Sequence, residues 1–325
     1  MSGADWRPSA AAGVLAHRGA MLARARAYFA SQRVLEVQTP LLSTAAVSDP
    51  EIESIAVQSR GGPRQFLQTS PEYPMKRLLA AGVGDCYQIC PVFRDGESGR
   101  QHSPEFTMIE WYRLGFGVLQ LQQDVDRLLR AVTAGLRRFA PTRSVSYREA
   151  IATHSGIDVR SAAPADIAAV LERHGIRPAG AERWDRDAWL DLLMGALVGP
   201  TLGRDAPLFV HDYPATQAAL ARLRRDADGT EVAERFELYV DGVELANGFH
   251  ELGDAAEQRR RFERDIALRR ARGQPGNPLD ERLLAALAHG LPDCAGVALG
   301  FDRLVMVTLG LPDLASAVSF ADDRG

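Results

Sequence analysis

The sequence predicts an α+β protein in which an antiparallel sheet is flanked by helices. Two pairs of strands carry this prediction. In the first pair, residues 87–93 and 105–114 form apolar or alternating strands on either side of a polar loop that contains glycine. In the second, residues 235–240 and 243–246 flank Asp241-Gly242, a dipeptide typical of tight hairpins. Between the two pairs, apolar residues recur at helical spacing over residues 118–139.

Composition and charge limit the classes of protein. The chain has 325 residues, of which 46% are apolar and 25% charged, so it can form one large soluble domain or two ordinary ones. Its net charge of −4 gives no general sign of nucleic-acid or membrane binding. It shows neither an export signal nor the roughly 18 consecutive apolar residues of a membrane span. Its cysteines, Cys86, Cys90 and Cys294, are too few for a disulfide framework, and we interpret Cys86 and Cys90 as core residues rather than zinc ligands. We therefore expect a cytoplasmic protein.

The first part of the chain alternates helices and short strands. Residues 14–32 have the spacing of an amphipathic helix, and a strand at 34–38 ends before Pro40. A strand at 66–68 leads into the sequence Thr69-Ser70-Pro71-Glu72. Thr69 and Glu72 have the spacing of a capping box, so we expect a helix that runs to about Ala81 and stops at Gly82.

The loop between the first two strands has the composition of a binding site. The first strand delivers Arg94 to its end, and the second places Glu110 and Tyr112 on one face. An arginine, a polar loop and the inward-facing Glu110 and Tyr112 together suit a ligand with both an anionic and a cationic group. A hairpin with a solvated tip, in which Arg94 pairs with a surface carboxylate, fits the same pattern.

The second hairpin brings two acids together. Its two-residue turn places Tyr239 opposite Glu244 and Leu238 opposite Leu245, so Glu237 and Glu244 share a face one diagonal step apart. Two acids on one face repel each other unless a cation or a basic group lies between them. We therefore favour a Mg²⁺ ion held by these carboxylates and by substrate phosphates over a surface hairpin with two solvated acids.

The remaining segments are mostly helical, with one further strand near the end of the sequence. Residues 155–205 are rich in alanine and predict a helical insertion, with pieces near 164–174 and 186–198. Asp254 and Glu257 mark the start of a basic helix, which we interpret as a solvated face rather than a docking surface for an acidic partner. Near the end, a strand of small residues passes through Gly300 into a helix. Glycine admits a ligand close to the backbone, and the helix start with Arg303 favours phosphate.

Three of these stretches resemble the signature motifs of class II aminoacyl-tRNA synthetases, in the lysyl version. The helix, strand and Pro40 resemble the first motif, which forms the dimer interface in that family. FR-(loop)-SPEFTMIEWY resembles the second, and GFDRLVM the third. Inside the second motif the family usually has Arg-Asn-Glu at 94–96 and His-Asn-Pro-Glu-Phe at 102–106. Here Gly96 and Ser103 depart from it, and Glu97 is a candidate to replace the missing carboxylate.

The resemblance covers almost the whole chain and implies a fold and an activity. We expect residues 1–325 to form a single class II synthetase-like catalytic domain, with a helical insertion around 155–205, and we expect a homodimer. The implied reaction joins a lysine-like amino acid to ATP as an aminoacyl-adenylate. The residues implied to bind the amino acid are Ser70, Pro71, Glu72, Glu110, Tyr112, Glu251 and Ala298. Those implied to bind ATP are Arg94, Asp95, Gly96, Glu97, Ser103, Phe106, Glu244, Leu245, Gly300 and Arg303. Arg94 and Arg303 would be catalytic, and Glu237 and Glu244 would hold Mg²⁺.

The resemblance also bears on the acceptor. A lysyl-tRNA synthetase has an anticodon-binding domain before the first motif, where this sequence has only residues 1–13. We therefore expect no tRNA acceptor. The family's paralogues without that domain transfer lysine or β-lysine to a lysine side chain of elongation factor P. A free-standing amino-acid or amide ligase, and a regulatory subunit that binds an amino acid without activating it, stay open.

Overall fold

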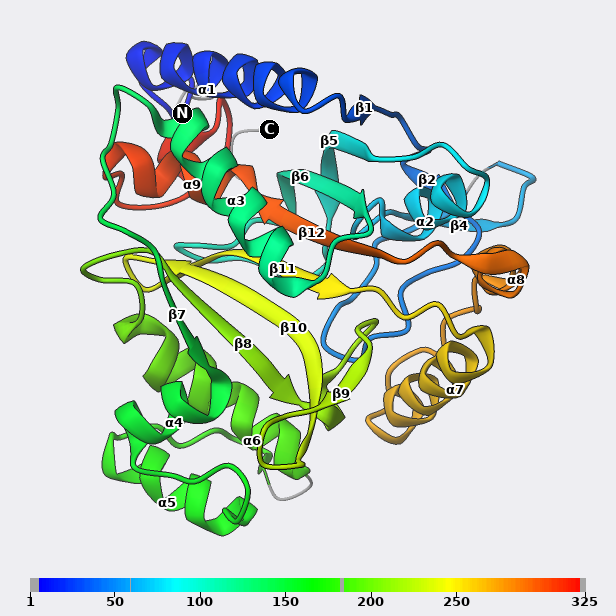
Figure 1. Cartoon of the computed structure of the whole chain (residues 1–325), viewed down its shortest axis with the longest axis vertical. Helices are drawn as coiled ribbons and strands as arrows, with labels where there is room; N and C mark the ends of the chain where they lie inside the picture. Colours follow the sequence, from blue (N-terminus) through cyan, green and yellow to red (C-terminus); the bar gives the residue numbers. More distant parts are fainter. Residues whose placement is uncertain (1–5, 59, 182–183, 322–325) are drawn as a thin grey trace, which may run out of the picture. The chain divides into compact units, whose positions relative to one another are not determined.

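The computed structural model describes residues 6–58, 60–181 and 184–321, which belong to two compact units (Figure 1). The first unit comprises Met1–Arg138 and His250–Gly325, and the second comprises Phe139–Phe249. In the part of the chain that is described, no helix combines the length and the apolar character that crossing a membrane requires. The helical insertion expected at 155–205 lies within the second unit.

The first unit is built on four strands in the order β1 (Leu35–Glu36), β5 (Cys86–Phe93), β6 (Glu105–Leu114) and β12 (Cys294–Gly300). β5 pairs with β6 and β6 with β12 in antiparallel fashion, which confirms the predicted hairpin. β1 runs parallel to β5, which the sequence did not predict. A smaller sheet has the order β2 (Leu42–Ser43), β4 (Arg64–Leu67) and β3 (Ala56–Gln58).

Two helices cover one face of these strands. α1 (Ala12–Ser31) and α3 (Val118–Thr133) lie side by side (Figure 1). From α1, the ring of Phe29 stacks on Tyr87 with 4.1 Å between centroids and meets Trp111 edge-on. α3 ends at Thr133, earlier than predicted, because Gly135 adopts a left-handed backbone with φ of 75°. Because Tyr87 and Trp111 point toward α1, the residues that alternate with them along β5 and β6 point to the opposite face.

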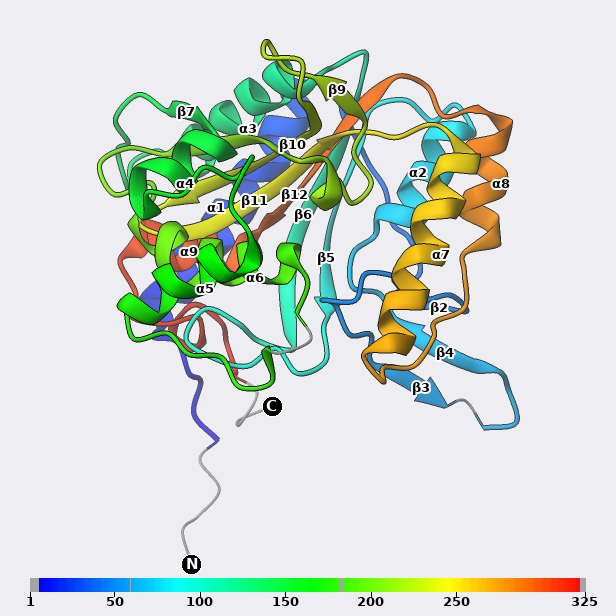
Figure 2. The same cartoon turned by 90° about the horizontal axis from the view of Figure 1, so that it is seen from below.

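The opposite face carries α2 (Glu72–Ala80). Its buried Met75 and Leu79 pack against Cys86, Tyr112 and Cys294. α8 (Glu281–Gly290) lies beside α2 and beside α7 (Ala255–Ala271), as Figure 2 shows. α7 begins where the sequence predicts, with the Asp254 side chain as its N-cap. α9 (Phe301–Leu309) follows β12 directly in the chain and contacts β6 and α1.

The second unit combines strands with the helical insertion. Its strand order is β11 (Val243–His250), β10 (Glu231–Val240), β8 (Leu208–Pro214) and β7 (Arg143–Ser146), and β9 (Leu223–Arg225) also pairs with β10. α4 (Tyr147–Ser155), α5 (Pro164–Arg173), α6 (Arg186–Leu193) and the π-helical turn Met194–Val198 share a core with these strands. The two predicted helical pieces are confirmed. The strands β7, β8 and β9 were not predicted.

The predicted hairpin of β10 and β11 forms, but its register differs beyond the first pairs. Asp241 and Gly242 both have positive φ, as the tight turn requires, and Tyr239 lies opposite Glu244. The next pair joins Leu238 to Ala246, so the expected pairing of Leu238 with Leu245 is wrong. The physical reason is a β-bulge, in which β11 contains one extra residue.

Candidate active site

Three carboxylates and one ammonium group meet on the α2 side of the first unit. The Lys76 Nζ atom lies 2.6 Å from Glu72 Oε1 and 2.6 Å from Glu251 Oε2. The third carboxylate, that of Glu110, accepts a hydrogen bond of 2.6 Å from Ser70 Oγ and one of 2.7 Å from Tyr112 OH. The structure thus brings the predicted amino-acid-binding residues together around a lysine that was not predicted.

The start of α2 explains why Glu72 points into this cluster. The predicted capping box is wrong, because Pro71 is the N-cap and no side chain caps the helix. The Glu72 amide instead donates to Ser70 Oγ at 3.0 Å. The Glu72 carboxylate is directed one helical turn onward to Lys76, a spacing at which an acid and a base on one helix meet.

Burial and mutual repulsion change the protonation of the acids. Burial raises the pKa of Glu110 to about 8, and the nearby charges of Glu72 and Glu251 add to that rise. Burial also raises the pKa of Glu251 to about 7, although the Lys76 ammonium opposes the rise. Burial alone would lower the pKa of Lys76, but Glu251 and Glu72 together hold it above its usual value. The cluster therefore holds one permanent cation and two acids that titrate near neutral pH.

Gly296 lets two members of this cluster approach β12. A Cβ atom there would lie 2.3 Å from Tyr112 Cε1 and 2.6 Å from Glu251 Oε1, which no real side chain could occupy without displacing them. Two residues further along β12, Ala298 lies opposite Glu110. It is half-buried and packs against an apolar cluster that includes Met108.

The predicted nucleotide-binding residues lie toward the other end of β6. The Arg94 guanidinium lies over the Phe106 ring, 5.2 Å from its centroid, and 3.5 Å from Glu97 Oε1. Among the described residues, the Arg94 Nε atom is buried without a hydrogen-bond partner. Arg303 Nε donates to the Gln101 carbonyl at 3.1 Å and so ties α9 to the polar loop. Buried donors of this kind suit an anionic ligand.

The polar loop itself is exposed and closely turned. Gly96 has φ of 75°, so a left-handed turn accounts for glycine where the family usually has a carboxylate. Asp95 is exposed, and its amide donates to the Glu53 carbonyl at 2.9 Å. Ser103 is half-buried. Gly300 ends β12 directly before α9, and a Cβ atom there would meet only the Arg303 side chain, at 3.6 Å.

One face of β6 connects the two groups of residues. Phe106, Met108, Glu110 and Tyr112 alternate along this face, and register places Gly296, Ala298 and Gly300 beside them. At a rise of about 3.3 Å per residue, Phe106 and Glu110 are separated by about 13 Å along the strand. This is an extended site, with apolar and guanidinium groups at one end and carboxylates at the other.

The predicted metal ligands lie in the second unit. Glu237 Oε1 lies 2.5 Å from an Arg235 guanidinium nitrogen, and Glu237 Oε2 accepts a 2.7 Å hydrogen bond from Tyr239 OH. Glu244, opposite Tyr239, shares their face, while Leu245 is the buried extra residue of the bulge. In the described part of the chain, no three His, Cys, Asp or Glu side chains gather as a metal site. Two carboxylates fit a Mg²⁺ ion that takes its other ligands from phosphate and water.

The family model of tRNA synthetases class II (D, K and N) matches residues 3–324. This chain belongs to the class II aminoacyl-tRNA synthetase family. Proteins named elongation factor P--(R)-beta-lysine ligase, from Salmonella gallinarum, Salmonella paratyphi B and Salmonella schwarzengrund, are each 45% identical to it over 326 residues. The match covers 99% of this chain and 98% of each relative. The α+β class and the flanked antiparallel sheet are thereby confirmed as those of a class II synthetase.

Sequence reasoning missed several residues of this class II site. Lys76 could have been found, because it is the only lysine in the sequence and lies four residues after Glu72. Arg235 could also have been found, because it lies two residues before Glu237 on one strand and the two side chains therefore share a face. Gly296 had no signal, because its need for glycine depends on contacts with Tyr112 and a distant acid.

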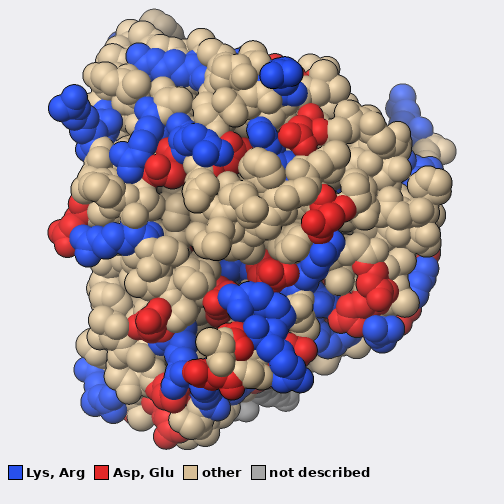
Figure 3. All heavy atoms as spheres, viewed as in Figure 1, with Lys and Arg blue, Asp and Glu red and all other residues tan. Residues whose placement is uncertain are grey.

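Other features of the sequence have structural explanations. Cys86, Cys90 and Cys294 are buried free thiols, as the core interpretation predicts. The basic side chains of α7 are matched by acids, among them Arg259 with Glu281 and Arg260 with Glu257. Figure 3 likewise shows basic and acidic side chains next to one another at several places on one face. These ion pairs fit a solvated face, but Arg261 and Arg269 of the same helix are buried, so the interpretation is wrong for those two residues.

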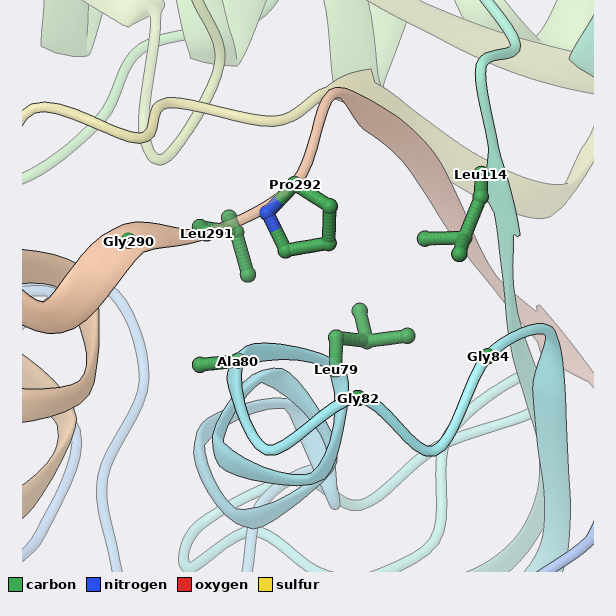
Figure 4. A pocket seen from close by; sticks show the side chains of 8 residues that line it. All are labelled: Leu79, Ala80, Gly82, Gly84, Leu114, Gly290, Leu291 and Pro292. Atoms are coloured by element: carbon green, nitrogen blue, oxygen red, sulfur yellow. The ribbon is translucent and has the colours of Figure 1, made fainter.

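An apolar pocket of about 460 Å³ lies at the C-terminal end of α2 (Figure 4). Its lining residues are Leu79, Ala80, Gly82, Gly84, Leu114, Gly290, Leu291 and Pro292. None of these side chains carries a charge, whereas Glu72 and Lys76 lie at the start of the same helix. A charged amino acid therefore has its partners at the carboxylate cluster and not in this pocket.

Proposed function

We propose that this class II protein is an ATP-dependent ligase that activates (R)-β-lysine, or lysine, and transfers it to a lysine side chain of elongation factor P. The observation that carries the proposal is the 45% identity, over 99% of the chain, to ligases of that name. The carboxylate cluster supports it, because a substrate with two ammonium groups needs several buried acids as partners. Glu72 would bind one amine, while Glu110, Tyr112 and Glu251 would surround the other.

In the first step, a carboxylate oxygen of the amino acid attacks the α-phosphorus of ATP. The bond from that phosphorus to the bridging oxygen breaks, and pyrophosphate leaves. Arg94 and Arg303 would stabilise the charge that develops on the phosphate oxygens, and the unpaired donor at Arg94 Nε supports this role. Phe106 would stack on the adenine, with Asp95, Glu97 and Ser103 nearby on the loop.

Divalent metal fits this chemistry through the acids of the second unit. Glu237 and Glu244 would hold Mg²⁺ together with the ATP phosphates, and the ion would supply positive charge that assists pyrophosphate departure. Arg235 already neutralises part of the charge on Glu237. We therefore expect the ion to bind tightly only when phosphate oxygens complete its coordination.

In the second step, the amine of the acceptor lysine attacks the carbonyl carbon of the adenylate. The bond between that carbon and the phosphate oxygen breaks, AMP leaves, and the nitrogen loses a proton as the amide forms. The acceptor amine must reach the middle of the β6 face, between Phe106 and Glu110, because the carbonyl carbon of the adenylate joins the nucleotide to the amino acid there.

ATP–pyrophosphate exchange with a panel of amino acids tests the activation step. We expect exchange with (R)-β-lysine and weaker exchange with lysine, and none with leucine, whose side chain offers no second ammonium group. Arg77→Gln, which removes an exposed charge from α2, should behave as the wild-type protein. If no amino acid supports exchange, the chain is a binding subunit and not a ligase. Exchange followed by transfer only to ammonia or small amines would identify an amide ligase instead.

We also propose that the protein is a cytoplasmic homodimer. Leu35 and Leu42, which follow α1 in the segment that resembles the first class II motif, are 53% and 42% exposed. Large apolar side chains at such exposure mark interaction surfaces when they lie close together. Sedimentation should give twice the chain mass, and Leu35→Glu should shift the equilibrium to monomer. A wild-type monomer at micromolar concentration would contradict the assignment.

A further inference from the structure

Lys76 is the only lysine in a sequence that has 38 lysine and arginine residues together. Its side chain is 1% exposed, so it serves neither solubility nor a surface ion pair. An ammonium group buried to this extent is tolerated only where acids compensate its charge. The chain thus uses arginine at every other basic position and places a lysine where two carboxylates converge.

The geometry links Lys76 to both ends of the carboxylate cluster. It lies one turn along α2 from Glu72 and reaches across to Glu251, whose amide donates to the Cys294 carbonyl beside β12. A single Nζ atom therefore holds two acids that come from segments about 180 residues apart in the chain. The compact ammonium group fits between them, whereas a planar guanidinium would need a wider gap.

We propose that Lys76 is a built-in ammonium group of the amino-acid pocket, which positions Glu72 and Glu251 and cancels one of the three carboxylate charges. When all three acids are ionised, the remaining charge of −2 matches a substrate that carries two ammonium groups. The inference rests on the proposed function, because it assigns Glu72, Glu110 and Glu251 to that substrate. Lys76 is thus a positioning residue that contributes to specificity without contacting the reacting atoms.

Without the Lys76 charge, the protonation of the three acids and the affinity for the substrate should both change. In Lys76→Met, the three acids would lose the cation that lies between Glu72 and Glu251, while Ser70 and Tyr112 would still donate to Glu110. Mutual repulsion would then keep the acids protonated to higher pH, so the substrate would have to compete with protons over a wider range. Each pH unit of that competition corresponds to about a tenfold loss of affinity.

Exchange kinetics as a function of pH test this expectation. For Lys76→Met we expect the KM for (R)-β-lysine near neutral pH to be about tenfold or more above that of the wild-type protein. As the pH is raised, KM should fall in both proteins, and in the variant it should level off about one pH unit higher. The value of kcat at saturation should change much less. Arg77→Gln, one residue further along α2 and exposed, is the matched control and should keep the wild-type profile.

A double-mutant cycle separates positioning from packing. If Lys76 acts through Glu251 and Glu72, then Lys76→Met should cost less in a Glu251→Gln background than in the wild-type protein, because one of its two partners is already lost. Additive effects on KM, or a wild-type pH profile in Lys76→Met, would overturn the proposal. A wild-type protein that exchanges no diamino acid would instead overturn the proposed function, so the two failures are distinguishable.

The single lysine also permits a test that does not depend on the variant's folding. Protein labelled with ¹⁵N-lysine should give one side-chain ammonium signal, which slow proton exchange in a buried ion pair should keep visible near neutral pH. We expect (R)-β-lysine to shift this signal and leucine to leave it unchanged. If a diamino acid that supports exchange leaves the Lys76 signal unmoved, the ammonium group is not part of the pocket.

Discussion

Ala298 on β12 lies directly opposite Glu110 on β6, on the face that also carries Tyr112 and Phe106. Its methyl group therefore lines the part of the site that lies between the carboxylate cluster and the nucleotide-binding residues. Lysyl-tRNA synthetases usually have glycine at this point of the motif. A β-amino acid carries its amine one carbon further from the carboxylate than an α-amino acid. It therefore needs a pocket of a different shape at this position.

We predict that Ala298→Gly shifts the preference from (R)-β-lysine towards α-lysine. A misfit of one methylene is worth roughly 1–3 kcal/mol of discrimination, so the ratio of kcat/KM for the two isomers should change by about tenfold or more. The measurement is exchange with each isomer by the wild-type and variant proteins. If the ratio stays the same, Ala298 only packs against its apolar neighbours.

Gly296→Ala should damage the same pocket by a different route. The added Cβ atom would have to displace the Tyr112 ring and the Glu251 carboxylate, so we expect a large rise in KM for the amino acid with a smaller effect on KM for ATP. Gly253→Ala is the matched control, since a Cβ atom there meets its nearest neighbour at 3.8 Å. Equal effects on the two substrates would show a general loss of structure.

The sequence predicted local structure wherever a periodic pattern was supported by a strong turn or breaker. The hairpin at Asp241-Gly242 and the full length of β6 are examples. Patterns failed where contacts distant in the chain decided the outcome. The bulge at Leu245 changes the register without altering the alternation nearby, and β1 pairs in parallel with a strand about 50 residues later. Neither is encoded within a short window.

Glu244→Ala should abolish adenylate formation while leaving the fold intact. Glu244 is half-buried on a strand face, and its loss removes an oxygen ligand that we assign to Mg²⁺. We expect no detectable exchange at ordinary Mg²⁺ concentrations and an unchanged melting temperature. Activity close to wild type in this variant would contradict the metal assignment.

The affinity for the diammonium substrate should depend on pH through Glu110. Because the pKa of Glu110 in the free protein is about 8, its carboxyl is mostly protonated at pH 7 and offers no negative charge. Below that pKa, affinity should fall by about tenfold per pH unit. Glu72, Glu251, Ser70 and Tyr112 surround the same carboxyl. The pKa of Glu251, about 7, should steepen the loss at lower pH.

Calorimetric titration of (R)-β-lysine over this pH range gives the measurement. In Glu110→Gln the dependence above pH 7 should disappear, and binding should be weaker at every pH. An affinity that does not change between pH 7 and pH 8 in the wild-type protein would show that Glu110 is already ionised when the substrate arrives.

The composition of the candidate site was more predictable than its chemistry. Family motifs pointed to Glu72, Glu110 and Glu251, and the structure brings all three together. The Lys76 ammonium and the Gly296 contact were not predicted, because each depends on partners from another segment of the chain. Charge balance inside a pocket is a property of the folded arrangement, and no single stretch of sequence contains it.

Transfer of the activated amino acid is the most direct test of the account. The protein, ATP, Mg²⁺ and (R)-β-lysine are incubated in parallel with elongation factor P and with lysine-accepting tRNA, and both products are measured by mass spectrometry. Because the chain's only lysine is buried between two acids, acylation of the protein itself should not obscure the result. We predict that elongation factor P gains one β-lysyl group on a lysine side chain and that tRNA stays unacylated. Efficient charging of tRNA, with elongation factor P unmodified, would contradict the account.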